Sequence, residues 1–270
     1  MAGENGGLHD LSPEMDRMLI AWAAGFGLII GSFLNVVIHR LPREESLVTP
    51  RSRCPACQTL IRPWDNIPVL SFLLLRGRCR ACGRPIAWRY PLVELLTGIL
   101  FAIAVIRFGV TPHTISLLVL LSALIAIAFI DLDHQIIPNA ITLPGIPFGL
   151  LTGLVLGDPP LLDRIIGALA GAGFLYLVLL YGSVVYGQDA MGEGDLNLIA
   201  MVGAFLGWKG VVITILFGCL SGSVVGVTLI GLQRLHRRAH IPFGPFLALG
   251  AVVALFWGDA LIGWYLGFYR

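Results

Sequence analysis

The sequence predicts an all-α integral membrane protein, a polytopic bundle of about eight transmembrane helices with a small cysteine-rich module between helices one and two. Three observations predict this fold class. Of the 270 residues, 57% are hydrophobic and 13% are charged, and the mean hydropathy of +0.85 is too high for a soluble globular domain. Apolar runs long enough to cross a bilayer recur along the chain. Four of the five cysteines fall in one polar segment.

The chain begins with a polar, glycine-rich and acidic stretch, residues 1–17, which we expect to be a disordered extracytoplasmic tail. The first apolar run, 18–38, is predicted to be the first transmembrane helix, since it lacks the small-residue site of a cleaved signal peptide. Within it, Gly31 and Ser32 permit close helix packing. Asn35 would need a hydrogen-bond partner inside the bundle.

Residues 39–90 are predicted to form a cytoplasmic module, because they contain ten arginines but only three acidic residues. Two C-x-x-C pairs in this segment supply four thiolates, which suit a closed tetrahedral zinc site with a structural role. Flanking arginines would offset the negative charge of these thiolates. Reduced cysteines without metal are the alternative, and a disulfide is less favoured in a reducing cytoplasm. The four predicted zinc ligands are Cys54, Cys57, Cys79 and Cys82.

Residues 91–270 are predicted to form a seven-helix membrane domain. Its apolar runs are 92–108, 114–130, 139–156, 165–187, 196–208, 210–233 and 241–268. The run 196–208 would give about 20 Å of helix, less than the hydrocarbon thickness. Either Lys209 snorkels and the helix continues, or the chain before Leu196 dips below the membrane surface. The fifth cysteine, Cys219, is expected only to pack within an apolar helix.

The distribution of basic residues predicts the orientation in the membrane. With the module inside, the inner side holds thirteen basic residues and the outer side five. The positive-inside rule then places both termini outside, and it places Asp131 and Asp195 on the same, cytoplasmic face. The inner set is the ten module arginines with Arg234, Arg237 and Arg238, and the outer set is Arg17, Arg107, Arg164, Lys209 and Arg270.

Two carboxylates stand at the ends of uncharged apolar runs. Asp131 follows 115–130, and Asp195 closes the sequence G-E-G-D just before 196–208. Ionisable groups at the edge of hydrocarbon are costly, and their default interpretation is functional. Gly192 and Gly194 would allow a tight bend or the close approach of a substrate strand, and Pro138 follows the first aspartate.

Two aspartates that share a proton can hydrolyse an amide without a nucleophilic side chain. No G-x-S-x-G, H-E-x-x-H or P-loop motif competes with this interpretation. Alternatively, Asp131 is a helix cap or a surface charge and Asp195 is the N-cap of the following helix. Asp133 could substitute for Asp131 or orient it, and Asp189 is expected to be solvated. Glu94 is either a buried functional acid or the partner of a module arginine.

Several motifs together resemble the bacterial type IV prepilin peptidase family of GxGD-type intramembrane aspartic peptidases. They are G-S-F-L-N-V-V-I-H-R-L-P at 31–42, the two C-x-x-C pairs, R-Y-P-L-V-E-L-L-T-G at 89–98, A-x-x-D-x-x-x-x-x-I-P at 128–138 and G-x-G-D at 192–195. The resemblance implies that Asp131 and Asp195 are catalytic. It also implies cleavage of type IV prepilin or pseudopilin leaders after Gly on the cytoplasmic side, followed by N-methylation of the new N-terminus with S-adenosylmethionine.

Two positions depart from the family pattern. Asn197 stands where lysine is frequent, and His39 where tyrosine is common. For the methyltransferase activity the sequence offers no glycine-rich nucleotide loop, and only Asn35, Arg40 and Glu94, with the zinc module, are loosely associated with it. A peptidase without methyltransferase activity is therefore the alternative.

The expected partners are a prepilin or pseudopilin precursor and the lipid bilayer, with no nucleic acid, and the oligomeric state is left open. The expected location is the bacterial inner membrane, as a multi-pass protein. A rival from another class is a transporter with a carboxylate relay. It would predict acids spread through several spans and an internal repeat, and neither is visible in the sequence. A zinc-stabilised scaffold without chemistry would not need both aspartates.

Overall fold

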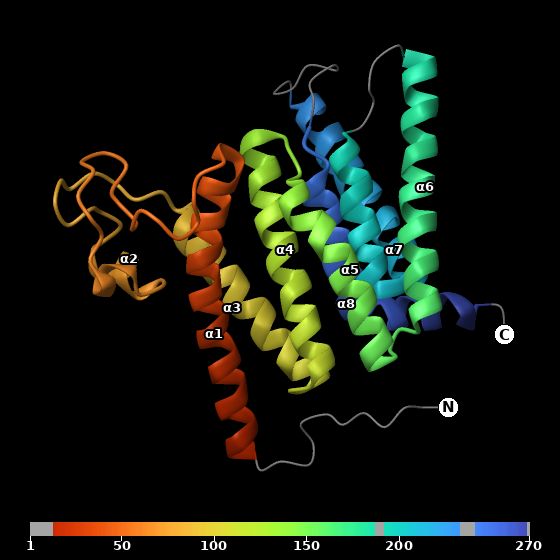
Figure 1. Ribbon diagram of the computed structural model, residues 1–270, viewed down its shortest axis with the longest axis horizontal. Helices are drawn as coiled ribbons and strands as arrows, with labels where there is room; N and C mark the ends of the chain where they lie inside the picture. Colours follow the sequence, from red (N-terminus) through yellow and green to blue (C-terminus); the bar gives the residue numbers. More distant parts are fainter. Residues whose placement is uncertain (1–12, 187–191, 233–240, 269–270) are drawn as a thin grey trace. The chain divides into compact units, whose positions relative to one another are not determined.

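The computed structural model describes residues 13–186, 192–232 and 241–268 (Figure 1). Within these ranges the chain is helical apart from turns, irregular loop segments and two isolated β-bridges. Seven of the described helices are long and apolar enough to cross a membrane. They are α1 (Pro13–Arg40), α3 (Arg89–Phe108), α4 (Pro112–His134), α5 (Asn139–Leu156), α6 (Leu161–Tyr186), α7 (Glu193–Gly231) and α8 (Gly244–Gly267). The predicted fold class is confirmed: the chain is an all-α polytopic membrane protein with a small module after its first span.

Some sequence-based expectations fall on residues outside the described ranges. Most of the N-terminal tail does so, as do Asp189 and the basic residues Arg234, Arg237 and Arg238. The described chain divides into two compact units, residues 1–126 and 127–270, and the boundary lies within α4.

In the first unit, α1 packs against α3 through glycines. A Cβ atom on Gly27 would lie 2.8 Å from the Cα of Gly98, and one on Gly31 would lie 2.6 Å from the Cα of Glu94. Any side chain at these positions would push the two helices apart. The expectation that Gly31 allows close helix packing is therefore confirmed.

In the second unit, α7 packs against α5, α6 and α8. Its 39 residues are interrupted at Gly207, whose φ of 69° and ψ of −178° are not helical. The predicted runs 196–208 and 210–233 are thus two helical segments joined at a kink. The helix continues past Lys209 and begins at Glu193, so Asp195 lies in its first turn rather than in a loop that dips into the membrane.

A buried arginine supports the kink in α7. Arg164, near the start of α6, is fully buried, which its place in the sequence does not indicate. Carbonyls beside a helix break lose their usual partners, and Arg164 Nη1 donates to the carbonyl of Ala204 at 3.3 Å. The guanidinium also donates to Gly149 O (2.8 Å), Thr152 Oγ1 (2.9 Å), Asp158 O (2.7 Å) and Pro159 O (3.0 Å).

Replacing Arg164 with methionine is expected to destabilise the protein by about 3 kcal/mol or more, because several buried acceptors would lose their donor. Thermal unfolding in detergent measures this loss. Arg107→Met is the matched control, since Arg107 is exposed on α3. Equal unfolding temperatures for the two variants would contradict the role of Arg164 as a structural donor.

Candidate active site

Both candidate aspartates are buried and belong to the second unit. Asp131 lies in the last turn of α4 and is 5% exposed, and Asp195 lies in the first turn of α7 and is 6% exposed. The charge of Asp131 acts electrostatically on Asp195. The structure therefore brings together two carboxylates that are 64 positions apart in the sequence.

Asp131 is held by the beginning of α8. The backbone N–H of Gly244, the first residue of that helix, donates to Asp131 Oδ2 at 2.8 Å. Amides in the first turn of a helix have no partner within the helix and favour negative charge. A Cβ on residue 244 would lie 2.7 Å from the same carboxylate oxygen, so only glycine leaves room for the contact. Sequence analysis missed Gly244, although a glycine before a proline at the start of an apolar run is a recognisable helix start.

Asp195 has one oxygen without a partner. Its backbone N–H donates to the carbonyl of Gly192 at 3.1 Å. Its side-chain atom Oδ1 is buried and accepts no hydrogen bond from the described part of the chain. Buried polar atoms are nearly always satisfied, so an exception needs an explanation. The N-cap of α7 is Gly192, which shows that the N-cap interpretation of Asp195 is wrong.

The segment after Asp131 packs against the turn before Asp195. A Cβ on Gly194 would lie 2.7 Å from the Cβ of Ile137, and the next residue, Pro138, is the N-cap of α5. Gly194 therefore allows the two carboxylate-bearing segments to approach each other. Gly192 is less restricted, because the nearest atom to its Cβ position is 3.8 Å away. Asp133 is exposed and does not share the burial of Asp131.

Asn197, which stands where lysine is frequent in the family pattern, makes a neutral hydrogen bond. Its Nδ2 donates to Asn139 Oδ1 at 2.9 Å. This contact ties the second turn of α7 to the first residue of α5. The pair provides a link between helices but no positive charge beside Asp195.

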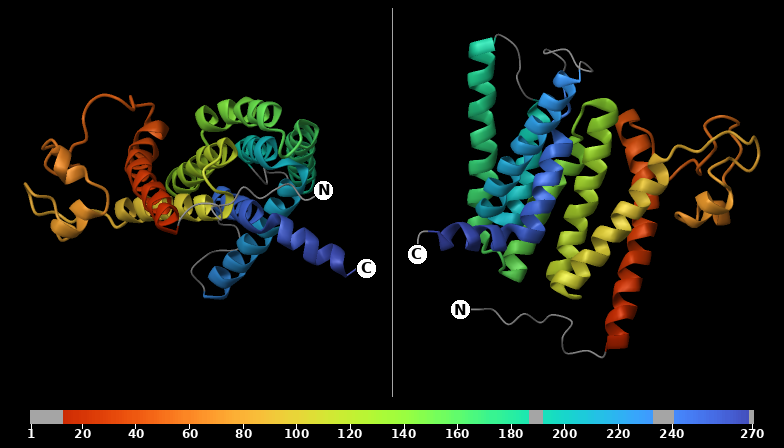
Figure 2. Two further views of the ribbon diagram at one scale, coloured as in Figure 1. Left: turned by 90° about the horizontal axis from the view of Figure 1, so that it is seen from below. Right: turned by 180° about the vertical axis from the view of Figure 1, so that it is seen from behind.

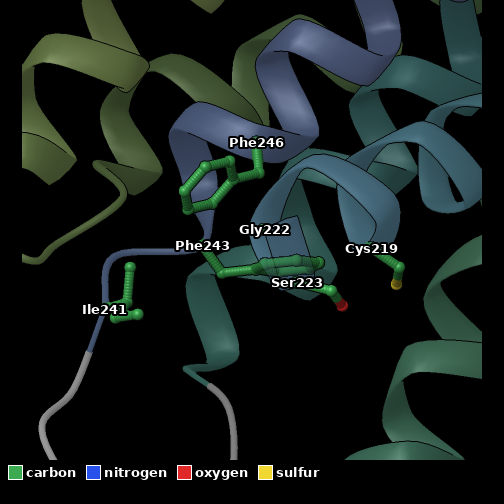
Figure 3. A pocket seen from close by; sticks show the side chains of 6 residues that line it. All are labelled: Cys219, Gly222, Ser223, Ile241, Phe243 and Phe246. Atoms are coloured by element: carbon green, nitrogen blue, oxygen red, sulfur yellow. The ribbon is translucent and has the colours of Figure 1, made fainter. Parts of the chain in front are cut away.

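A pocket of about 260 Å³ lies next to the start of α8 (Figure 3). The aromatic rings of Phe243 and Phe246, which flank Gly244 in the sequence, line it together with residues of α7. Cys219 lies on α7 and is exposed at this pocket. The remaining lining residues are Gly222, Ser223 and Ile241.

The four module cysteines converge in the first unit. Their sulfur atoms all lie within 4.8 Å of one another, and the Sγ atoms of Cys54 and Cys82 are 3.9 Å apart. Four thiolates around zinc at about 2.3 Å lie roughly 3.8 Å apart, so the donor set fits this metal. A hydrogen bond with the Thr59 side chain lowers the pKa of the Cys57 thiol to about 6.

The two cysteine knuckles have the same backbone design. Cys54 N–H donates to Thr59 O at 3.0 Å, and Cys79 N–H donates to Arg84 O at 2.8 Å. Each turn also needs one residue in the left-handed region, namely Gln58 and Gly83. This repeated geometry presents each cysteine pair from one tight turn.

Asn35, Arg40 and Glu94 are all buried. Asn35 links α1 to α3, whereas Arg40 and Glu94 bind backbone groups of the module. Asn35 Nδ2 donates to Tyr90 O at 3.0 Å. Glu94 Oε2 accepts the backbone N–H of Val69 at 2.7 Å, so this carboxylate binds a backbone amide of the module. The guanidinium of Arg40 donates to Ser46 O (2.9 Å) and Pro50 O (2.6 Å).

These features define a polytopic helical membrane protein with a buried carboxylate pair and a separate four-cysteine module. Residues 26–108 match the family described as the bacterial peptidase A24 N-terminal domain. Residues 118–227, which include both aspartates, match the type IV leader peptidase family. The chain belongs to the type IV leader peptidase family.

Curated relatives carry the name prepilin leader peptidase/N-methyltransferase. The relative from Aeromonas salmonicida is 41% identical over 266 residues and covers 89% of this chain and 91% of its own length. The relative from Pseudomonas aeruginosa is 39% identical over 265 residues and covers 90% of this chain and 91% of its own length. The relative from Myxococcus xanthus is 47% identical over 204 residues and covers 76% of this chain and 61% of its own length. No solved structure matches the chain.

Proposed function

We propose that the chain is a membrane aspartic endopeptidase that removes the leader of type IV prepilins or pseudopilins. Cleavage follows a glycine on the cytoplasmic side of the bacterial inner membrane, and the new N-terminal residue is then methylated. Family membership and the names of the relatives support both activities. The observation that carries the peptidase proposal is the burial of Asp131 and Asp195 within electrostatic reach of each other.

The two carboxylates supply the acid and the base that amide hydrolysis needs. One takes a proton from water as the water oxygen bonds to the scissile carbonyl carbon, and the other gives a proton to the leaving amine as the C–N bond breaks. The Gly244 amide fixes one oxygen of Asp131. The unpartnered Oδ1 of Asp195 is then available to the water or to the substrate.

Gly244→Ala is expected to lower the cleavage rate by about 10-fold or more, because the added methyl group would displace the Asp131 carboxylate and misplacement of a catalytic group is costly. Cleavage of a prepilin in detergent-solubilised protein measures the effect. Gly263→Ala in the same helix is the control, since open space surrounds that position. A Gly244→Ala variant as active as Gly263→Ala would contradict the proposed contact.

Zinc fits the four module cysteines and would have a structural role, since four thiolates leave no coordination position open. The zinc would therefore take no part in peptide cleavage. The metal would hold together the two loops that α1 and α3 carry.

S-adenosylmethionine would supply the methyl group for the second activity. The residues associated with it do not form a cradle for a nucleoside: Arg40 and Glu94 are occupied by backbone groups of the module. Of the polar side-chain atoms that the structure describes in Asn35, Arg40 and Glu94, Asn35 Oδ1 is the one that is buried without a hydrogen-bond partner. The methyltransferase half of the proposal is thus supported by the relatives' names, and a peptidase that does not methylate is the alternative.

One assay tests both halves. Purified protein is incubated with a prepilin, with and without S-adenosylmethionine, and the product mass is measured. Loss of the leader in both samples supports the peptidase, and an added methyl group only with the cofactor supports the methyltransferase. An intact prepilin in both samples would contradict the proposal.

A further inference from the structure

The module presents a group of large apolar side chains to its surroundings. Trp88 is 76% exposed and Leu74 is 73% exposed. Within the short helix α2 (Leu70–Leu74), Phe72 alone is buried, and its ring packs against that of Trp88 with centroids 4.8 Å apart. We call the exposed group the α2 surface. It consists of Trp64, Leu70, Leu73, Leu74 and Trp88.

The α2 surface belongs to a module that is joined to membrane spans at both ends. α1 enters it at Arg40 and α3 leaves it at Arg89. The ribbon diagrams show this module beside the C-terminal half of α1 rather than beyond the end of that helix (Figures 1 and 2). Buried contacts from Arg40 and Glu94 fix it there. The α2 surface is therefore carried between two helices that are long and apolar enough to cross a membrane.

The charge of the module complements an anionic bilayer. Residues 39–90 contain ten arginines and three acidic residues, and one of these acids, Asp65, is engaged by Arg80 at 2.6 Å. Arg62 lies over the ring of Trp64, 5.9 Å from its centroid. Tryptophan and arginine together are typical of the membrane–water interface, where rings enter the head-group layer and cations bind anionic lipid. The exposed arginines nearest in sequence to α2 are Arg62, Arg76 and Arg78.

We infer that the α2 surface inserts into the head-group layer of the bilayer and that the arginines around it bind anionic lipid. An exposed apolar group of this kind marks an interaction site. Lipid is the occupant that satisfies both the apolar side chains and the positive charge, and the two flanking spans bring it within reach. The module thereby lies on the membrane surface instead of projecting into water, whether or not the proposed peptidase activity holds.

Tryptophan quenching in nanodiscs tests this inference with the full chain. The discs contain anionic and zwitterionic lipids with brominated acyl chains, and iodide is the aqueous quencher. Trp88→Phe and Trp64→Phe are compared with wild type, and phenylalanine at 88 keeps an aromatic ring beside Phe72. Trp22→Phe is the reference for a lipid-facing ring, because Trp22 is 73% exposed within α1. Zinc content confirms that each module is folded.

Trp64→Phe and Trp88→Phe should each remove part of the tryptophan emission that brominated lipid quenches, as Trp22→Phe should. The part of the emission that iodide quenches should stay unchanged. Loss of the iodide-quenched emission would show that the rings face water and would overturn the inference. Loss of emission that neither quencher reaches would show that protein covers the rings, and it would overturn the inference as well. In discs without anionic lipid the bromolipid quenching of the module should fall; unchanged quenching would refute the role of the arginines.

Discussion

Replacing either Asp131 or Asp195 with asparagine is expected to reduce prepilin cleavage by about 10²–10⁴-fold or more, the usual contribution of a positioned acid or base. Asparagine keeps the size of the side chain but can neither take up nor release the required proton. Because the two aspartates act in one proton-transfer cycle, loss of either should stop it. Cleavage is followed with purified protein in detergent or in membranes.

Asp133→Asn is the matched control for these variants. Asp133 lies two residues from Asp131 but is exposed, so its substitution should leave most of the activity. All three variants should remain inserted and should unfold at similar temperatures. Full activity of Asp131→Asn or Asp195→Asn would exclude the proposed pair, and inactivity of Asp133→Asn alone would transfer the role of Asp131 to its neighbour.

Substituting serine for Cys54 or Cys79 is expected to release the zinc and unfold the module. Structural zinc contributes about 10 kcal/mol of apparent binding free energy in small zinc domains, and this module has little regular secondary structure to hold its loops. The described residues in it include one short helix, two 3₁₀ turns and two isolated bridges. Metal analysis gives the zinc content, and limited proteolysis reports the loss of structure.

Cys219→Ser provides the comparison, because Cys219 lies on α7 and outside the four-sulfur cluster. This variant should retain one zinc ion per chain and the protease resistance of the wild type. Wild-type protein purified without metal chelators that contains no zinc would contradict the assignment. Cysteine variants that keep their full zinc content would do so too.

Much of the fold was predictable because hydropathy directly reflects the length of each span. Apolar runs located every long helix, and the two C-x-x-C pairs predicted the cysteine cluster. The same physics located Asp131 and Asp195, since a charge at the end of an apolar run is conspicuous. The glycine at 194 was also predictable as a site of close approach, although its neighbour, Ile137, was not.

Other features depend on three-dimensional contacts that leave little trace in composition. The burial of Arg164 is one, because its acceptors are backbone carbonyls that any residue could supply. The Gly244 amide is another, because it comes from a residue 113 positions after the aspartate that it contacts. The break in α7 was expected beside Lys209 but lies at Gly207, where the positive φ favours glycine.

The central claim is that Asp131 and Asp195 act on one scissile bond, and binding of a transition-state mimic tests it most directly. A prepilin-derived peptide with a secondary alcohol in place of the scissile carbonyl should bind wild-type protein far more tightly than the unmodified peptide does. Calorimetry in detergent measures the affinity. Asp131→Asn and Asp195→Asn should each lose this advantage, while Asp133→Asn keeps it. Tight binding that persists in either Asp131→Asn or Asp195→Asn would show that the two carboxylates do not share the site.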